Sequence, residues 1–153
     1  PEHEQCLATV DSYLIGPAGD RLTAQEEVPF RSLHELPFIL PSAPNGLRTA
    51  LDSMARQEHI TLAPVIEADS LPLQTSLVAR ERLYTVLPLH AVWTEVGKGE
   101  VQAARIVDPP FQRTVALVFA KTKGPAKAVS AIAGLIGEIV DRMARDGMWR
   151  TDR

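Results

Sequence analysis

The stretch from residue 36 to residue 57, LPFILPSAPNGLRTALDSMARQ, decides the fold because it holds a buried strand followed at once by a helix. The run Pro37–Pro41 is short, apolar and bounded by prolines, which is typical of a buried strand in a parallel sheet. Ser42 and Asn45 supply the residue types that cap a helix. Apolar residues then recur at the spacing of one helix face, and these are Leu47, Ala50, Leu51 and Met54. The stretch therefore predicts one strand–helix unit of an α/β fold.

The same alternation continues on both sides of this unit. Further strands are expected at residues 7–15, 61–68, 83–88, 101–107 and 114–122. One helix should run from Ser70 to about Arg80, and a long terminal helix should open at Gly124-Pro125 and end near Gly147. Residues 21–36 are polar, and a loop with a short helix at Arg31–Glu35 is expected there. The pattern predicts an α/β fold with a mainly parallel sheet flanked by helices, whose ligand crevice lies at the carboxyl ends of the strands.

Composition excludes several classes of protein. The chain has 153 residues, 45% of them hydrophobic, which is enough for one compact domain or two small lobes. A net charge of −3 and 5% aromatic residues do not fit a basic nucleic-acid module. The single cysteine, Cys6, rules out an internal disulfide and fits a reducing, cytoplasmic setting. The apolar runs are too short to cross a membrane, so no membrane partner is expected.

Polar residues follow two of the predicted strands, at the point where each strand ends. Ser42 and Asn45 follow the strand at Pro37–Pro41, and Asp69 and Ser70 follow the strand at residues 61–68. Backbone N–H groups and a hydroxyl converge at such helix starts, which favours a small anion such as a carboxylate. The alternative is that each serine only caps its own helix.

Other chemistry finds less support in the sequence. No Gly-x-Ser-x-Gly motif is present, so a hydrolytic nucleophile is not expected. The histidines have no metal-ligand spacing, and we predict no metal and no cofactor; they are His3, His34, His59 and His90. His90 follows the strand at residues 83–88 and lies at the expected crevice end, where it either contacts a ligand or packs at the rim.

Several segments, taken in order, resemble the second lobe of LysR-type transcriptional regulators. These segments are Leu36–Arg48, Glu67–Ser70, Leu77–Ala79 and Tyr84–Pro88. The strand and turn at residues 11–19 and the terminal strand and helix are similar to the parts that connect this lobe to the first. One departure is the charged segment Arg80–Leu83, where members of the family often carry glycines.

The resemblance implies a periplasmic-binding-protein-like effector domain. Residues 37–108 would form lobe two, and residues 1–36 and 109–153 would be the remnant of lobe one, whose first half is expected upstream of Pro1. The effector-binding residues that carry over are Ser42, Asn45, Ser70 and Leu89. A small metabolite would bind between the lobes of a homo-oligomer, which contacts DNA only through an N-terminal winged helix-turn-helix absent from this chain.

Two other classes remain open at this point. A solute-binding protein of a transporter needs the same fold and crevice, and a small α/β enzyme would need a catalytic group in the crevice. We expect a sensor rather than an enzyme, because the sequence offers polar groups for binding but no catalytic motif.

Overall fold

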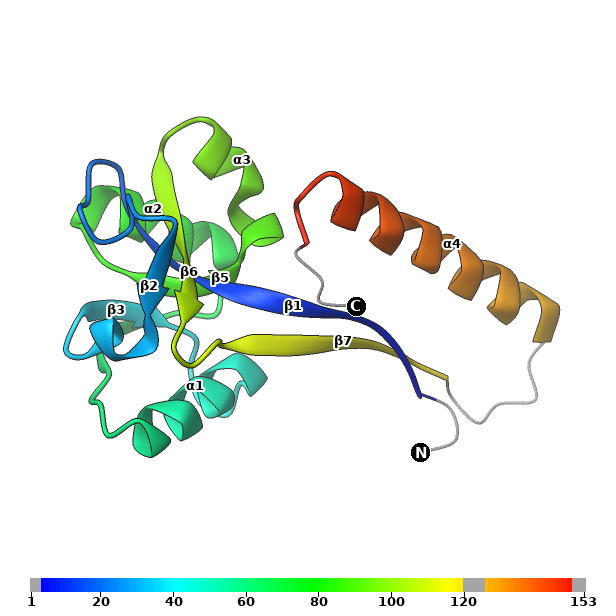
Figure 1. The fold of residues 1–153 in the computed structure, drawn as a ribbon, viewed down its shortest axis with the longest axis horizontal. Helices are drawn as coiled ribbons and strands as arrows, with labels where there is room; N and C mark the ends of the chain where they lie inside the picture. The colour runs from blue at the N-terminus through cyan, green and yellow to red at the C-terminus, as the bar shows by residue number, and fades with distance from the viewer. Residues whose placement is uncertain (1–3, 120–125, 150–153) are drawn as a thin grey trace. The chain divides into compact units, whose positions relative to one another are not determined.

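The computed structural model describes residues 4–119 and 126–149, and it divides into two compact units (Figure 1). Unit 1 comprises Pro1–Asp11 and Gln112–Arg153, and unit 2 comprises Ser12–Phe111. Strand β1 (Glu4–Pro17) belongs to unit 1 up to Asp11 and to unit 2 thereafter. These boundaries differ from the lobe boundaries expected at residues 37 and 108, and the assignment of family lobes stays a prediction.

Unit 2 contains the sheet β2-β6-β1-β5 and the two-stranded sheet β3-β4, and an isolated bridge between β3 and the entrance of β5 gives the combined order β4-β3-β5-β1-β6-β2. Its strands after β1 are β2 (Glu27–Pro29), β3 (Pro37–Leu40), β4 (Ala63–Glu67), β5 (Thr85–Pro88) and β6 (Val101–Val107). The pairs β3–β4 and β2–β6 are parallel, and a parallel bridge between Phe38 and Tyr84 joins β3 to the entrance of β5. Strand β1 is antiparallel to both β5 and β6. The strands β2 to β6 thus share one direction, and all the antiparallel pairs among the described strands involve β1.

Strand β1 is the exception to the parallel arrangement, and it also pairs antiparallel in unit 1. The cause is the loop at residues 18–26, which turns the chain back after β1 so that β2 runs the other way. A parallel connection would instead need a crossover of a dozen residues or more.

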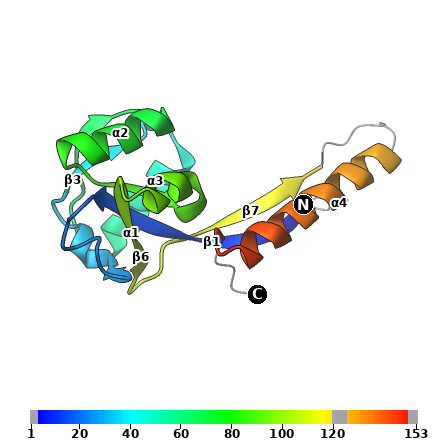
Figure 2. The ribbon, with the colours of Figure 1, turned by 90° about the horizontal axis from the view of Figure 1, so that it is seen from above.

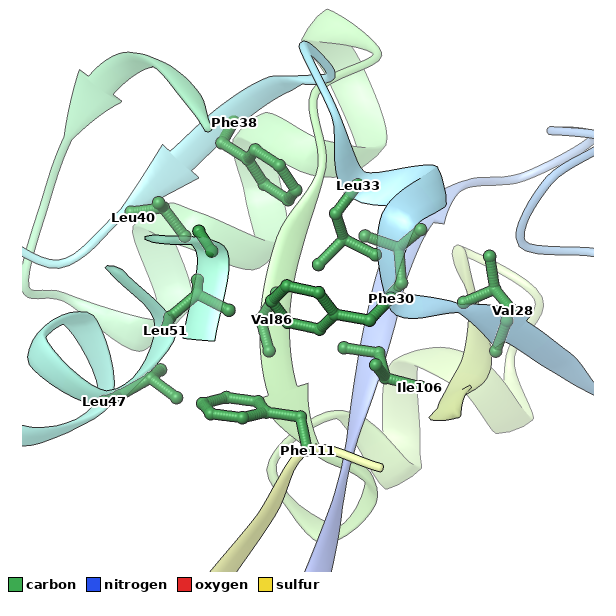
Figure 3. Close-up of a cluster of buried hydrophobic side chains, with 13 residues drawn as sticks. Val28, Phe30, Leu33, Phe38, Leu40, Leu47, Leu51, Val86, Ile106 and Phe111 are labelled. Atoms are coloured by element: carbon green, nitrogen blue, oxygen red, sulfur yellow. The ribbon is translucent and has the colours of Figure 1, made fainter. Parts of the chain in front are cut away.

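Helices cover both faces of this sheet. They are the α-helices α1 (Gly46–Gln57), α2 (Leu71–Glu81) and α3 (Trp93–Gly97), and the 3₁₀ helices η1 (Phe30–Leu33) and η2 (Leu89–Val92). Helix α1 packs Leu51 into a cluster with Phe38 and Val86 (Figure 3). Val78 of α2 packs in a second cluster with Leu87 of β5. Neighbouring residues of a strand point to opposite faces, so α1 and α2 lie on opposite sides of the sheet.

Unit 1 is a small assembly of two strands and one helix. The first part of β1 pairs antiparallel with β7 (Gln112–Val118), and α4 (Ala126–Arg145) accompanies them (Figure 2). Its buried hydrophobic residues are Ala8, Val10, Val140 and Trp149. A stripe on α4 stays exposed instead, and we call Val129, Ile132, Leu135 and Ile139 the α4 stripe.

Some predicted elements differ from the observed ones. Strand β2 and the helices η2 and α3 were not expected, because three to five residues are too short to show a periodicity. The short helix expected at Arg31–Glu35 is the 3₁₀ turn η1. The expected strand at 114–122 is β7 at 112–118. Residues 120–122 and the expected helix opening at Gly124-Pro125 lie outside the described residues.

Candidate functional site

Three of the predicted binding residues lie at one edge of the unit 2 sheet. Ser42 follows β3, Ser70 follows β4 and Leu89 follows β5. Because these three strands are neighbours and run in the same direction, their carboxyl ends meet at the same edge. The structure thus brings together groups that are up to 47 residues apart in sequence, counted from Ser42 to Leu89. We call this arrangement the strand-end edge.

A direct hydrogen bond connects the first two of these segments. The backbone N–H of Ser42 donates to Oδ1 of Asp69 over 3.0 Å. Next to it, the backbone N–H of Ala68 donates to the carbonyl of Leu40 over 2.9 Å. The sequence predicts Asp69 at the second helix start, but it carries no signal that Asp69 is the partner of Ser42. The carboxylate therefore fixes the two segments side by side at the edge.

Asn45 acts as the cap of α1. Its Oδ1 accepts hydrogen bonds from the N–H groups of Leu47 at 2.9 Å and Arg48 at 3.3 Å. The residue is extended, with φ −128° and ψ 139°, as a capping residue should be. The capping interpretation therefore holds for the oxygen of Asn45, and only its amide N–H groups are left to contact a ligand.

Ser70 differs from Asn45, although it also occupies a cap position. It precedes α2 with an extended backbone, yet its side chain makes no capping hydrogen bond. Pro72 is in the first turn of that helix and carries no N–H. The exposed hydroxyl of Ser70 is thus not committed to the helix start, which removes the simple capping alternative for this serine.

Gln74 holds the turn between β4 and α2, and it is not among the binding residues that the sequence predicts. The residue is buried, with 4% exposure. Its Nε2 donates to the carbonyl of Ala68 at 2.6 Å, and its Oε1 accepts from the hydroxyl of Thr85 at 3.3 Å. In the segment from Leu71 to Leu77, a polar side chain such as that of Gln74 is expected at the surface of the helix. No local feature of the sequence therefore indicates that it is buried. Its bonds position the start of α2 beside β5.

Arg48 performs a similar role for the turn between β3 and α1. Its guanidinium binds Asp52 at 2.9 Å, Glu67 at 2.8 Å and the carbonyl of Pro41 at 3.1 Å. The side chain is only 13% exposed. The hydrogen bond to Glu67, opposed by burial and aided by Asp52, raises the pKa of Arg48 above its ordinary value. The i, i+4 spacing of Arg48 and Asp52 was the one signal that could have identified this pair.

The third segment of the edge is mainly apolar. Leu89 is half-buried in η2 and packs against the cluster that contains Val78 and Leu87. The next residue, His90, is also half-buried, and burial lowers the pKa of its imidazole. At neutral pH this histidine is therefore uncharged and adds no positive charge to the edge.

The edge offers polar and apolar groups that can bind a ligand. It presents two serine hydroxyls, an amide, a carboxylate and apolar surface. Among residues 4–119 and 126–149, no group of three or more metal-ligating side chains lies together. In the same residues, no helix is long and apolar enough to cross a membrane.

Two curated relatives of this chain are described as regulators or activators of genes. One is the HTH-type transcriptional regulator BbuR of Bordetella bronchiseptica, 24% identical over 136 residues, which cover 89% of this chain and 42% of the relative. Another is a probable hydrogen peroxide-inducible genes activator of Mycobacterium avium, which is 29% identical over 131 residues. These residues cover 85% of this chain and 42% of the relative. The chain thus spans less than half the length of these curated relatives.

Solved structures show the same fold. The regulatory domain of Synechocystis CcmR in complex with 2-PG has a TM-score of 0.77 and 16% identity, over 92% of this chain and 67% of that one. The effector-binding domain of QuiR in complex with shikimate has a TM-score of 0.70 and 17% identity. The match covers 90% of this chain and 66% of that one. These similarities confirm the predicted α/β, periplasmic-binding-protein-like fold. The family model described as LysR substrate binding domain matches residues 3–140, and the chain therefore belongs to this family.

Proposed function

We propose that the chain is the effector-binding part of a LysR-type transcriptional regulator and that it senses a small anionic metabolite. The observation that carries the proposal is the strand-end edge. There Ser42 and Ser70 lie on adjoining segments, and the Ser70 hydroxyl is not used for capping. Membership of the LysR substrate binding domain family supports it.

The start of α2 is the part of the edge best suited to an anion. The N-terminus of a helix carries a partial positive charge, and negative groups are stabilised there by about 0.3–1 kcal/mol or more. No acidic residue occupies the first turn of α2. The Ser70 hydroxyl can donate to the same anion, while the Asn45 amide and the apolar surface of Leu89 would contact the rest of the effector.

The proposed mechanism is differential binding rather than chemistry. Residues 37–108 would act as lobe two of the family fold, and residues 1–36 and 109–153 as part of lobe one. An effector that contacts both lobes favours one lobe angle, and that angle alters the geometry of a homo-oligomer on promoter DNA. DNA contact would come from an N-terminal domain outside this chain, in keeping with the net charge of −3. The protein would act in the cytoplasm and would need no cofactor.

The substitution Ser70→Ala in the intact regulator tests the proposal. Loss of one hydrogen bond to a charged group costs about 1.5–3 kcal/mol, so the effector concentration for half-maximal response should rise at least about tenfold. The measurement is effector-dependent promoter binding by fluorescence anisotropy. Thr49→Ala, at an exposed position of α1, is the control and should leave the response unchanged. An unchanged response in Ser70→Ala would show that the site is wrongly assigned.

A further inference from the structure

A cavity lies in unit 2 and runs along α2, from the first turn that follows Ser70 to the last turn at Arg80. It is a groove of about 510 Å³ between α2, η2, α3 and the start of β6. Its lining residues are Leu71, Pro72, Thr75, Ser76, Ala79, Arg80, Ala91, Glu95, Glu100 and Val101. Small-molecule sites occupy roughly 300–1,000 Å³, so the groove has the size of one. We call it the α2–α3 groove.

The groove has a charged end. Arg80 lies in the last turn of α2, which leads into β5, and Glu100 directly precedes β6. Strands β5 and β6 run in the same direction, since both are antiparallel to β1, so these two residues lie at the same edge of the sheet. Glu95 is held close to Glu100, because the backbone N–H of Glu100 donates to the carbonyl of Glu95 at 2.9 Å.

These three charged groups are not used by the fold. Among the described residues, none of the hydrogen bonds and ion pairs involves the side chain of Arg80, Glu95 or Glu100. The charged end therefore offers two carboxylates and one guanidinium to a ligand, within the same 510 Å³ space.

The remainder of the groove is mainly apolar, apart from the exposed hydroxyl of Ser76. Ala79 and Ala91 contribute small side chains to the lining, and Leu71 contributes a larger one at the opposite end of α2. The one buried hydroxyl in the lining, that of Thr75, is already bonded to the carbonyls of Leu71 at 3.0 Å and Pro72 at 3.1 Å. This part of the groove suits a hydrocarbon chain rather than a polar group.

We propose that the α2–α3 groove binds a small zwitterion with an apolar side chain, namely an apolar α-amino acid. The ammonium group would contact Glu95 and Glu100, the carboxylate would contact Arg80, and the side chain would extend along Ala79 and Ala91. A simple anion would leave both glutamates without a partner, and a simple amine would leave the arginine without one. Each of these ligands would therefore bind more weakly than the amino acid.

Isothermal titration calorimetry on the 153-residue protein tests the proposal, with L-leucine as the probe. Two matched compounds each lack one charge: 4-methylpentanoate has no ammonium group, and 3-methylbutylamine has no carboxylate. Glycine lacks the apolar chain. We expect leucine to bind at least about tenfold more tightly than any of the three, since each loses an interaction worth about 1.4 kcal/mol or more.

Variants locate the binding. The double substitution Glu95→Gln and Glu100→Gln should weaken leucine at least tenfold, and Ser76→Phe, at an exposed position of the lining, should block it. Glu81→Gln, on the same helix but outside the lining, is the charge-matched control. Ser70→Ala should not change leucine binding, which separates this groove from the strand-end edge. The proposal is overturned if leucine gives no heat, if the three compounds match it, or if Ser76→Phe and the double variant bind it normally.

Discussion

The carboxylate of Asp20 organises the turn that follows β1 from a single buried position. It is 9% exposed, and it accepts hydrogen bonds from the hydroxyl of Tyr84 at 2.7 Å and from the N–H and hydroxyl of Thr23, both at 2.9 Å. Burial alone would raise the pKa of Asp20, but these hydrogen bonds lower it below its ordinary value. Burial and the nearby carboxylate raise the pKa of Tyr84 to about 12.

These shifts predict how stability depends on pH. Asp20 contributes stability above its unfolded pKa of 3.8, and the contribution is lost as the pH falls through the lower folded value. Tyr84 contributes stability below pH 10, and the contribution is lost as the pH rises from 10 toward about 12. In Tyr84→Phe the loss above pH 10 should shrink, and unfolding at pH 7 should cost about 1–3 kcal/mol less because a buried carboxylate loses a donor. Urea unfolding from pH 2 to 12 measures both effects, and identical profiles for the two proteins would contradict the assignment.

Gly16 is needed beside this network because of a close approach. A Cβ atom at Gly16 would lie 2.5 Å from the Oγ1 and 2.7 Å from the Cγ2 of Thr23. Gly16→Ala should therefore displace Thr23 and lower the free energy of unfolding by about 1–3 kcal/mol. Gly97→Ala in α3 meets nothing within 4 Å and serves as the control, with equal or slightly higher stability expected. Equal urea midpoints for both variants would show that the Thr23 side chain can move aside without lowering the free energy of unfolding.

At the scale of the element, two helix starts that look alike in sequence behave differently. Asn45 bonds two N–H groups of α1, whereas Ser70 bonds none of α2. Asn45→Ala should therefore lower the free energy of unfolding by about 1 kcal/mol, the usual value of a cap. Ser70→Ala should change it by less than about 0.5 kcal/mol. Urea unfolding of the two variants distinguishes a capping role from a binding role. A large loss of stability in Ser70→Ala would show that this serine stabilises the fold.

The elements show what sequence could and could not predict. Helix α1 was predicted because its apolar period and its cap agree, and the strand Pro37–Leu40 because prolines bound a short apolar run. The strand Thr85–Pro88 was predicted because it lies within the apolar run at residues 83–88. The same signals placed Ser42 and Ser70 at strand ends, and the sheet order then brought them to one edge. The periodicity of apolar residues does not indicate which side chains form hydrogen bonds with residues in other elements. The hydrogen bonds between Gln74 and Thr85 and between Arg48 and Glu67 could therefore not be predicted from it.

At the scale of the whole molecule, the α4 stripe is an apolar feature of unit 1 that the core of that unit does not use. The exposures of its four residues run from 43% for Val129 to 59% for Leu135. Two residues of the stripe, Val129 and Ile132, also line a groove of about 290 Å³, whose other lining residues are apolar or aromatic and come from β7, Phe119 and α4. Contiguous apolar surface of this kind marks an interface in soluble proteins. We therefore expect the 153-residue protein to self-associate through this helix, with a second copy of the chain covering the stripe.

Charge placed in the stripe should reverse that association. Leu135→Lys puts an ammonium group into the apolar contact, where an unpaired charge is strongly unfavourable, so the molar mass should fall toward that of a monomer. Ser130→Lys adds the same charge at an exposed position of α4 outside the stripe and should leave the mass unchanged. Size-exclusion chromatography with light scattering at several concentrations measures the mass. A parent protein of 16.7 kDa at every concentration would refute self-association, and equal masses for parent and Leu135→Lys would place the contact elsewhere.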